Sequence, residues 1–344
     1  MNTTAEADNR LVNTTGSSII VPSTAEGVAL CAAFILSFVF IIVGNLLTIV
    51  LFAANRRLRK RSLFLVISMA FADLMLGTLS LPIYIYDLFG VNFKFGKFGY
   101  PMSLHIFYMI ADTFFMFASL NSAAFISGER LYAIYWPLKH RALSMRAYCV
   151  IILIVWILPL PIAALWTALR LLVSTKYAMY AWMSNTLLLI LIMCGCNIGI
   201  WRKFQGESIA SQQQNRVSKS KRLTRTLLLL SALALLTWLP LTVLNCLINI
   251  CEIQIPWKFY HLVVIINYSN SFVNPVVYAL RIPEFREALA VCCLRRPVAP
   301  NIVDNKSGNN RNLALTLGTE LRTLPTESSH PKLAFKNCVL DTKL

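Results

Sequence analysis

Ionisable side chains are rare in the apolar stretches of this 344-residue chain, and the few present could bind charged partners. Asp73 lies in MAFADLML, Asp112 lies in MIADTFF, and Glu129 and Arg130 stand side by side in SGERLYAIYW. A carboxylate held away from water attracts a cation strongly, because a low dielectric constant strengthens the Coulomb interaction. These four side chains are therefore candidates for ligand binding, ion pairing or ion relay.

The elements that must position these side chains are membrane spans. The chain is 57% hydrophobic and 14% charged, with a mean hydropathy of +0.63, whereas soluble domains carry about 25% charged residues. A helical span needs roughly 20 mostly apolar residues. No repeat of fixed period is visible in the sequence. Seven such stretches are predicted: 28–53, 63–89, 103–135, 146–168, 178–202, 223–249 and 258–280.

Basic residues lie on alternate loops, and NRRLRKRS after the first span holds five of them. The positive-inside rule then predicts an outside N-terminus and an inside C-terminus. The net charge of +17 therefore reflects membrane orientation, and we expect no nucleic-acid partner. The polar N-terminal tail carries glycosylation sequons at Asn2 and Asn13, which favour the same orientation.

We therefore predict an all-α, seven-transmembrane helix bundle in the plasma membrane, with a short amphipathic helix after the seventh span. The expected parts are an extracellular tail over residues 1–27, the bundle over 28–280, the juxtamembrane helix over 281–296 and a disordered cytoplasmic tail over 297–344.

Helical geometry relates two of the charged residues. Asp112 and Arg130 are 18 residues apart, which is five turns of 3.6 residues, so they share one face about 27 Å apart. Because lipid satisfies neither charge, this face is expected to point into the bundle. On its own, Arg130 could instead snorkel to the interface, and Asp112 could be a structural carboxylate.

The seventh predicted span carries a polar seam in NYSNSFVNP. Its proline, Pro275, removes a backbone donor and loosens the helix. A second proline, Pro240, follows Trp238 in the sixth span. Both features suit helices that pivot, although prolines are common in membrane helices.

With these residues placed, the chain resembles the rhodopsin-like (class A) G-protein-coupled receptors over roughly residues 30–295. One marker falls in each of six spans: Gly44-Asn45, Ala72-Asp73, Glu129-Arg130, Trp156, Trp238-Leu239-Pro240 and Asn274-Pro275-Val276-Val277-Tyr278. The resemblance implies a receptor that binds an extracellular small ligand and activates a heterotrimeric G protein, with arrestin as a further partner.

The resemblance also implies roles at the inner half. Arg130 would hold the inactive state through Glu129 and contact the G protein when span 6 moves outward. Leu138 would enter the G-protein groove, and Tyr278 would rotate inward on activation. A polar network would hold either an allosteric sodium ion or water, and no other cofactor is expected. Its residues are Asn45, Asp73, Ser119, Asn270 and Asn274.

At the outer half, Asp112 and Tyr268 stand where amine receptors of this family bind the ligand's ammonium group. The residues expected in its pocket most resemble those of the biogenic-amine and trace-amine receptors. The resemblance therefore implies that the chain binds a protonated amine. Trp238 would close around the cation, and Asn185 would bind a polar group. A peptide, nucleoside or lipid ligand is the alternative.

Several positions depart from the family's pattern. His105 replaces a cysteine, so the usual bridge to the second outer loop is absent, and Cys246 and Cys251 could form another bridge or remain free. Span 6 lacks the acid that often locks Arg130, with Ser220 nearest by spacing, which predicts raised ligand-free signalling. Leu131 stands where tyrosine is usual, and this leaves open how Arg130 is supported in the active state.

The C-terminal region offers two further sites. Cys292 and Cys293, near the end of the predicted juxtamembrane helix, look like palmitoylation sites. The terminal DTKL fits a PDZ-binding motif through Thr342 and Leu344.

Other function classes fit the sequence less well. A transporter or channel with Asp73 and Asp112 as relays would require inverted repeats or paired broken helices, which are not found. An intramembrane enzyme would need paired aspartates or a Ser-His or metal constellation at membrane depth, and none is apparent. We therefore expect the chain not to be an enzyme.

Overall fold

The computed structural model describes residues 24–55, 58, 61, 63–93, 101–207, 216–281 and 283–294. All of them belong to one compact unit, residues 1–297. Asn2, Asn13, Thr342 and Leu344 lie outside the described residues, as does the tail over 297–344.

Every regular element within the described ranges is helical, which confirms the all-α prediction. The elements are α2 (Thr24–Ala54), α3 (Leu63–Met75), η2 (Leu76–Ser80), α4 (Leu81–Phe93), α5 (Met102–Tyr135), α6 (Pro137–Ala142), α7 (Met145–Ile157), α8 (Pro159–Leu172), α9 (Thr175–Glu207), α10 (Arg216–Asn249), α11 (Trp257–Arg281) and α12 (Pro283–Leu294).

Seven helical stretches in the described part of the chain are long and apolar enough to cross a membrane, as predicted. They are Ala25–Ala54, Leu63–Gly90, Met102–Tyr135, Met145–Leu172, Thr175–Gln205, Leu228–Asn249 and Trp257–Arg281. The largest differences from prediction are at the fourth span, which continues to Leu172, and the sixth, whose apolar part begins at Leu228 inside the longer helix α10.

The second span is interrupted by the π-helical turn η2. The backbone N–H of Leu81 donates to the carbonyl of Leu76, five residues back. Pro82 follows directly and has no N–H to donate, while its ring clashes with the carbonyl four residues earlier in a regular α-helix. The wider turn relieves this clash, and hydropathy alone does not predict it. In the fourth span, helix α8 begins anew at Pro159.

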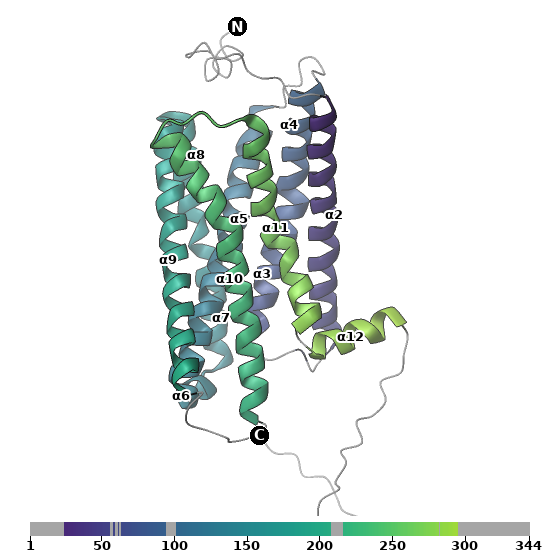
Figure 1. The fold of residues 1–344 in the computed structure, drawn as a ribbon, viewed down its shortest axis with the longest axis vertical. Coiled ribbons are helices and arrows are strands. Elements are labelled where there is room, and N and C mark those ends of the chain that lie inside the picture. The colour runs from purple at the N-terminus through teal and green to yellow at the C-terminus, as the bar shows by residue number, and fades with distance from the viewer. Residues whose placement is uncertain are drawn as a thin grey trace, which may run out of the picture. The chain divides into compact units, whose positions relative to one another are not determined.

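Helix α5 is the central element, because it packs against α3, α8, α9 and α10. Helix α11 packs against α10 and α2, and these neighbours stand side by side in Figure 1. A Cβ atom on Gly44 of α2 would lie 3.0 Å from Cγ of Pro275 in α11. A glycine at position 44 therefore allows these two spans to approach closely.

Helix α12 lies across one end of the bundle, next to the last turn of α11 (Figure 1). Its Phe285 is 1% exposed, and its ring lies 6.3 Å from Phe52 and 6.1 Å from Tyr278, measured between centroids. This apolar anchoring confirms the short helix expected after the seventh span. The side chains of Cys292 and Cys293, near the end of α12, lie outside the described residues.

Candidate ligand, network and switch sites

The bundle has two ends, which we name the Asp112 end and the Arg130 end after the α5 residues near them. At the Asp112 end, α5 and α11 meet through a direct hydrogen bond. The hydroxyl of Tyr268 donates to Oδ1 of Asp112 at 2.9 Å. Tyr268 is 2% exposed, whereas Asp112 is half-buried. Among the described residues, no arginine or lysine pairs with Asp112.

Aromatic rings surround Tyr268. Its ring centroid lies 6.2 Å from that of Phe34 and 6.0 Å from that of Tyr84. The hydroxyl of Tyr84 is 2.6 Å from Nδ1 of His261, and the ring of Trp257 also lies against His261, with centroids 4.2 Å apart. Spans 1, 2 and 7 therefore form an aromatic wall beside the carboxylate.

Trp238 lies in a second aromatic cluster. Its ring stacks on Trp182 with centroids 6.0 Å apart at an angle of 26°, and Phe117 completes the group at 6.2 Å from Trp238. Trp238 is 2% exposed, and its indole N–H has no acceptor among the described residues. The cluster therefore links α5, α9 and α10.

Three consecutive polar residues of span 5, Ser184, Asn185 and Thr186, have different surroundings. Ser184 is exposed and donates to the carbonyl of Ala181. Thr186 is buried and donates to the carbonyl of Trp182. Asn185, the residue predicted to contact a ligand, has a buried amide nitrogen without an acceptor in the described part of the chain.

Among the other amides with a buried, unpaired atom in the described ranges, two lie on α10 and α11. Asn245 of α10 is 3% exposed and its Oδ1 has no donor, and Asn267 of α11 is 2% exposed with both amide atoms unpaired among the described residues. Asn267 belonged to the polar seam seen in the sequence. Asn245 was missed, although an amide in the apolar run LTVLNCLIN was a usable signal.

Two exposed ion pairs involve residues at the ends of α2, α9 and α11 and in the segment after α10. Nζ of Lys176 lies 2.6 Å from Oε1 of Glu252, and Nζ of Lys258 lies 3.1 Å from Oε1 of Glu26. The hydrogen bond from Lys176 lowers the pKa of Glu252. Because both partners are exposed, such pairs contribute little to stability.

The structure does not form the Cys246–Cys251 bridge, one of the two alternatives left open by the sequence. Both cysteines are free thiols. Cys246 directs its Sγ toward Sδ of Met183 on α9 at 3.6 Å, and Cys251 is exposed beyond the end of α10. The helical position of Cys246 therefore favours packing against α9 over a link to the loop.

Asp73 is fully buried in the middle of the bundle and accepts three hydrogen bonds. The hydroxyls of Ser119 and Ser271 each donate to Oδ1 at 2.7 Å, and Nδ2 of Asn274 donates to Oδ2 at 3.0 Å. Asn45 reinforces the group by donating to the backbone carbonyl of Ser271 at 2.9 Å. The structure thus adds Ser271 to the predicted network.

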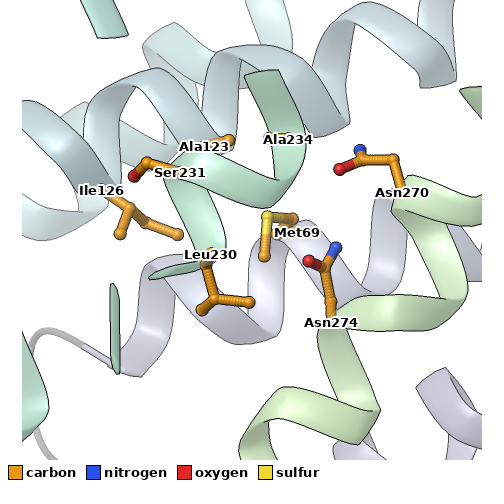
Figure 2. Close-up of a pocket in the computed structure, with 8 residues that line it drawn as sticks. All are labelled: Met69, Ala123, Ile126, Leu230, Ser231, Ala234, Asn270 and Asn274. Atoms are coloured by element: carbon orange, nitrogen blue, oxygen red, sulfur yellow. The ribbon is translucent and has the colours of Figure 1, made fainter. Parts of the chain in front are cut away.

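Asn270 lies in this region but lines a small cavity. The cavity has a volume of about 10 Å³, close to the minimum of about 10–15 Å³ that holds one water molecule. Figure 2 shows Asn270 and Asn274 on its α11 side, with Met69 and Ser231 also lining it. The nearby oxygen donors, a carboxylate, hydroxyls and amides, are those that hard cations prefer, so the donor set fits a sodium ion as well as water.

At the Arg130 end, Glu129 and Arg130 form the ion pair that their adjacency suggested. Arg130 is 3% exposed and Glu129 is 8% exposed, so neither snorkels to the surface. Two residues unforeseen from the sequence also bind Glu129. Nε2 of His140 is 2.6 Å from Oε1, and the hydroxyl of Tyr148 donates to the same oxygen at 2.8 Å.

The remaining residues predicted at this end differ in exposure. Leu138 on α6 is 79% exposed, whereas Tyr278 is fully buried and its hydroxyl has no partner among the described residues. Leu131 packs on α9, where a Cβ atom on Gly199 would lie 2.9 Å from its Cδ1. The side chain of Ser220 lies outside the described residues.

The sequence was also compared with known proteins. The model of the family described as 7 transmembrane receptor (rhodopsin family) matches residues 44–278. The chain is similar to Adenosine receptor A3 of Ovis aries, with 23% identity over 74% of this chain and 88% of the relative. It is also similar to Trace amine-associated receptor 6 of Rattus norvegicus, with 26% identity over 81% of this chain and 89% of the relative.

Proposed function

Because the chain belongs to the rhodopsin family of seven-transmembrane receptors, we propose that it is a receptor for a protonated amine. The observation that carries this proposal is the half-buried carboxylate of Asp112, which is oriented by Tyr268 and pairs with no arginine or lysine in the described ranges. Membership of this receptor class also means that the chain is not an enzyme.

The physical chemistry of the site supports an amine. A carboxylate away from bulk water binds an ammonium group more strongly than it would in solution. The surrounding aromatic rings can add cation–π attraction. The similarity to a protein named Trace amine-associated receptor 6 agrees with this ligand class.

The unpaired amide atoms of Asn185, Asn245 and Asn267 suggest that the ligand carries a second polar group. A buried amide without a partner is costly, and a ligand hydroxyl or amide would satisfy it. The amine is therefore expected to carry hydrogen-bonding groups at a distance from its nitrogen.

A nucleoside is the second candidate. An asparagine amide offers one acceptor and two donors, which matches the edge of a purine. Asn245 and Asn267 favour this candidate, as does the similarity to a protein named Adenosine receptor A3. Under this proposal Asp112 would contact a hydroxyl or amino group of the ligand.

The Arg130 end is proposed to face the cytoplasm and a heterotrimeric G protein. The N-terminus would then be extracellular and the C-terminus cytoplasmic, in the plasma membrane. The buried Glu129–Arg130 pair would hold the resting state, and the exposed Leu138 would contact the G protein. Arrestin binding, a PDZ partner through Thr342 and Leu344, palmitoylation at Cys292 and Cys293, and glycosylation at Asn2 and Asn13 complete the proposal.

We further propose that Asp73 and its neighbours hold a sodium ion in the resting receptor. Asp73 would supply the negative charge, and the oxygens of Ser119, Ser271 and the nearby asparagines would complete the ligand set. A bound cation would offset the cost of burying Asp73.

The proposed function is tested by second-messenger output from cells expressing the chain, challenged with separate amine and nucleoside panels. We expect an amine to elicit a response that Asp112→Asn abolishes at unchanged surface expression. A response to nucleosides that survives Asp112→Asn would support the second candidate, and ion currents without any second-messenger response would contradict both.

A further inference from the structure

An apolar groove of about 790 Å³ lies between α9 and α10 near the Arg130 end. It is lined by Asn197, Ile198, Trp201, Phe204 and Gln205 of α9 and by Arg225, Leu228, Leu229 and Ala232 of α10. Close-packed interiors leave few voids larger than a water molecule, whereas ligand pockets measure roughly 300–1,000 Å³. The groove is therefore large enough to bind a molecule.

The groove crosses the edge of the apolar layer. The apolar part of α9 ends at Gln205, and that of α10 begins at Leu228. Arg225 lies just beyond this edge, and Ala232 lies one turn inside it. Trp201, which is 63% exposed, stands near the same boundary, where tryptophan is enriched in membrane proteins.

The charge at the mouth of the groove is positive. Arg225 is exposed, and no carboxylate pairs with it among the residues that the structure describes. The planar guanidinium group suits two-point binding of a phosphate. The groove thus combines a positive charge at its mouth with apolar walls. A binding site for an anionic amphiphile needs both features.

We propose that this groove binds an anionic phospholipid of the adjoining membrane leaflet. The phosphate pairs with Arg225, and an acyl chain lies against Ile198, Trp201 and Leu229. The chain's own connecting segment does not suit the groove, because SIASQQQN, residues 208–215, is mainly polar and would leave the apolar walls uncovered. A zwitterionic lipid would leave the charge of Arg225 without a net counter-charge.

Lipid binding in this groove is thermodynamically linked to the relative positions of α9 and α10. The lipid contacts both α9 and α10, so its affinity depends on their separation, and its binding favours the arrangement that keeps the groove open.

The test uses the full chain in nanodiscs of phosphatidylcholine doped with a photoreactive lipid. The probes are phosphatidylserine and phosphatidylcholine carrying the same diazirine-labelled acyl chain, and the labelled peptides are mapped by mass spectrometry. We expect the serine probe to label residues 198–204 and 228–232. Arg225→Ala should reduce this labelling about fivefold. The control Arg146→Ala, which removes an exposed arginine from α7, should leave it unchanged.

A second pair of variants tests the apolar half of the site. Ala232→Phe fills the groove while keeping Arg225, and Leu236→Phe adds bulk one turn further along α10, outside the lining. Only Ala232→Phe should reduce labelling. Equal labelling by both probes, unchanged labelling in Arg225→Ala, or displacement by soluble glycerophosphoserine would overturn the proposal.

Discussion

Tyr148 of α7 donates a hydrogen bond of 2.8 Å to Oε1 of Glu129, the carboxylate that pairs with Arg130 of α5. Span 4 therefore takes part in holding the charged pair, together with His140 of α6. The acid that often comes from span 6 in this family is absent from the sequence, whereas α6 and α7 each contribute a contact to Glu129.

We expect Tyr148→Phe to raise ligand-free signalling. The change removes a hydrogen bond to a charged group; if about 1 kcal/mol of it favours the resting state, the active population rises about fivefold while that population is small. The measurement is basal second-messenger output normalised to surface expression. Tyr135→Phe is the control, because that exposed hydroxyl makes only a 3.3 Å bond to the carbonyl of Gly199. Basal output in Tyr148→Phe equal to that of the control would contradict the prediction.

Tyr268→Phe should weaken the response to an amine without abolishing it. The ring remains, but the hydrogen bond that orients Asp112 is lost, and bonds to charged groups contribute about 1.5–3 kcal/mol. The concentration for half-maximal response should rise roughly tenfold to a hundredfold.

The control for Tyr268→Phe is Tyr84→Phe, in the same aromatic wall. Its hydroxyl bonds to His261, so the change should affect amine potency less. Equal losses in the two variants would assign the effect to the aromatic wall as a whole and contradict a specific bond to Asp112.

Sodium should stabilise the ligand-free receptor through Asp73. In purified protein, the unfolding temperature is expected to be higher in sodium chloride than in choline chloride at the same ionic strength. Asp73→Asn should remove this difference, and Ser271→Ala should reduce it, because Ser271 lies 2.7 Å from the carboxylate. A sodium effect of full size in Asp73→Asn would place any sodium site elsewhere.

Gly44→Ala should destabilise the bundle. The added Cβ would lie 3.0 Å from Cγ of Pro275, and the overpacking of two spans costs about 1–3 kcal/mol. Gly195→Ala is the matched control, since nothing lies within 4 Å of its added Cβ, and the better helix former should stabilise α9 by about 0.5–1 kcal/mol. Thermal unfolding of both variants measures the contrast, and a Gly44→Ala protein as stable as the unaltered chain would refute the close approach.

The seven spans, the family and the polar residues worth testing could all be predicted from the order of the amino acids. Hydropathy is a property of local composition, and the period of 3.6 residues is set by the backbone, so the shared inward face of Asp112 and Arg130 needed no knowledge of neighbouring helices. The π-helical turn η2 in the second span was the exception, since a proline in a membrane helix can kink, widen or leave the turn unchanged.

The contacts between side chains of different helices could not be predicted, because they depend on how the helices pack. Ser271 bonds Asp73 while Asn270 lines the adjoining cavity, and this follows from the rotation of α11, which packing against α2 and α10 sets. The contacts of Tyr148 and His140 with Glu129, and of Cys246 with Met183, depend in the same way on how neighbouring helices are aligned. The spacing of residues along one helix predicts the face on which each side chain lies. Which side chain of another helix it contacts depends on the packing of the whole bundle.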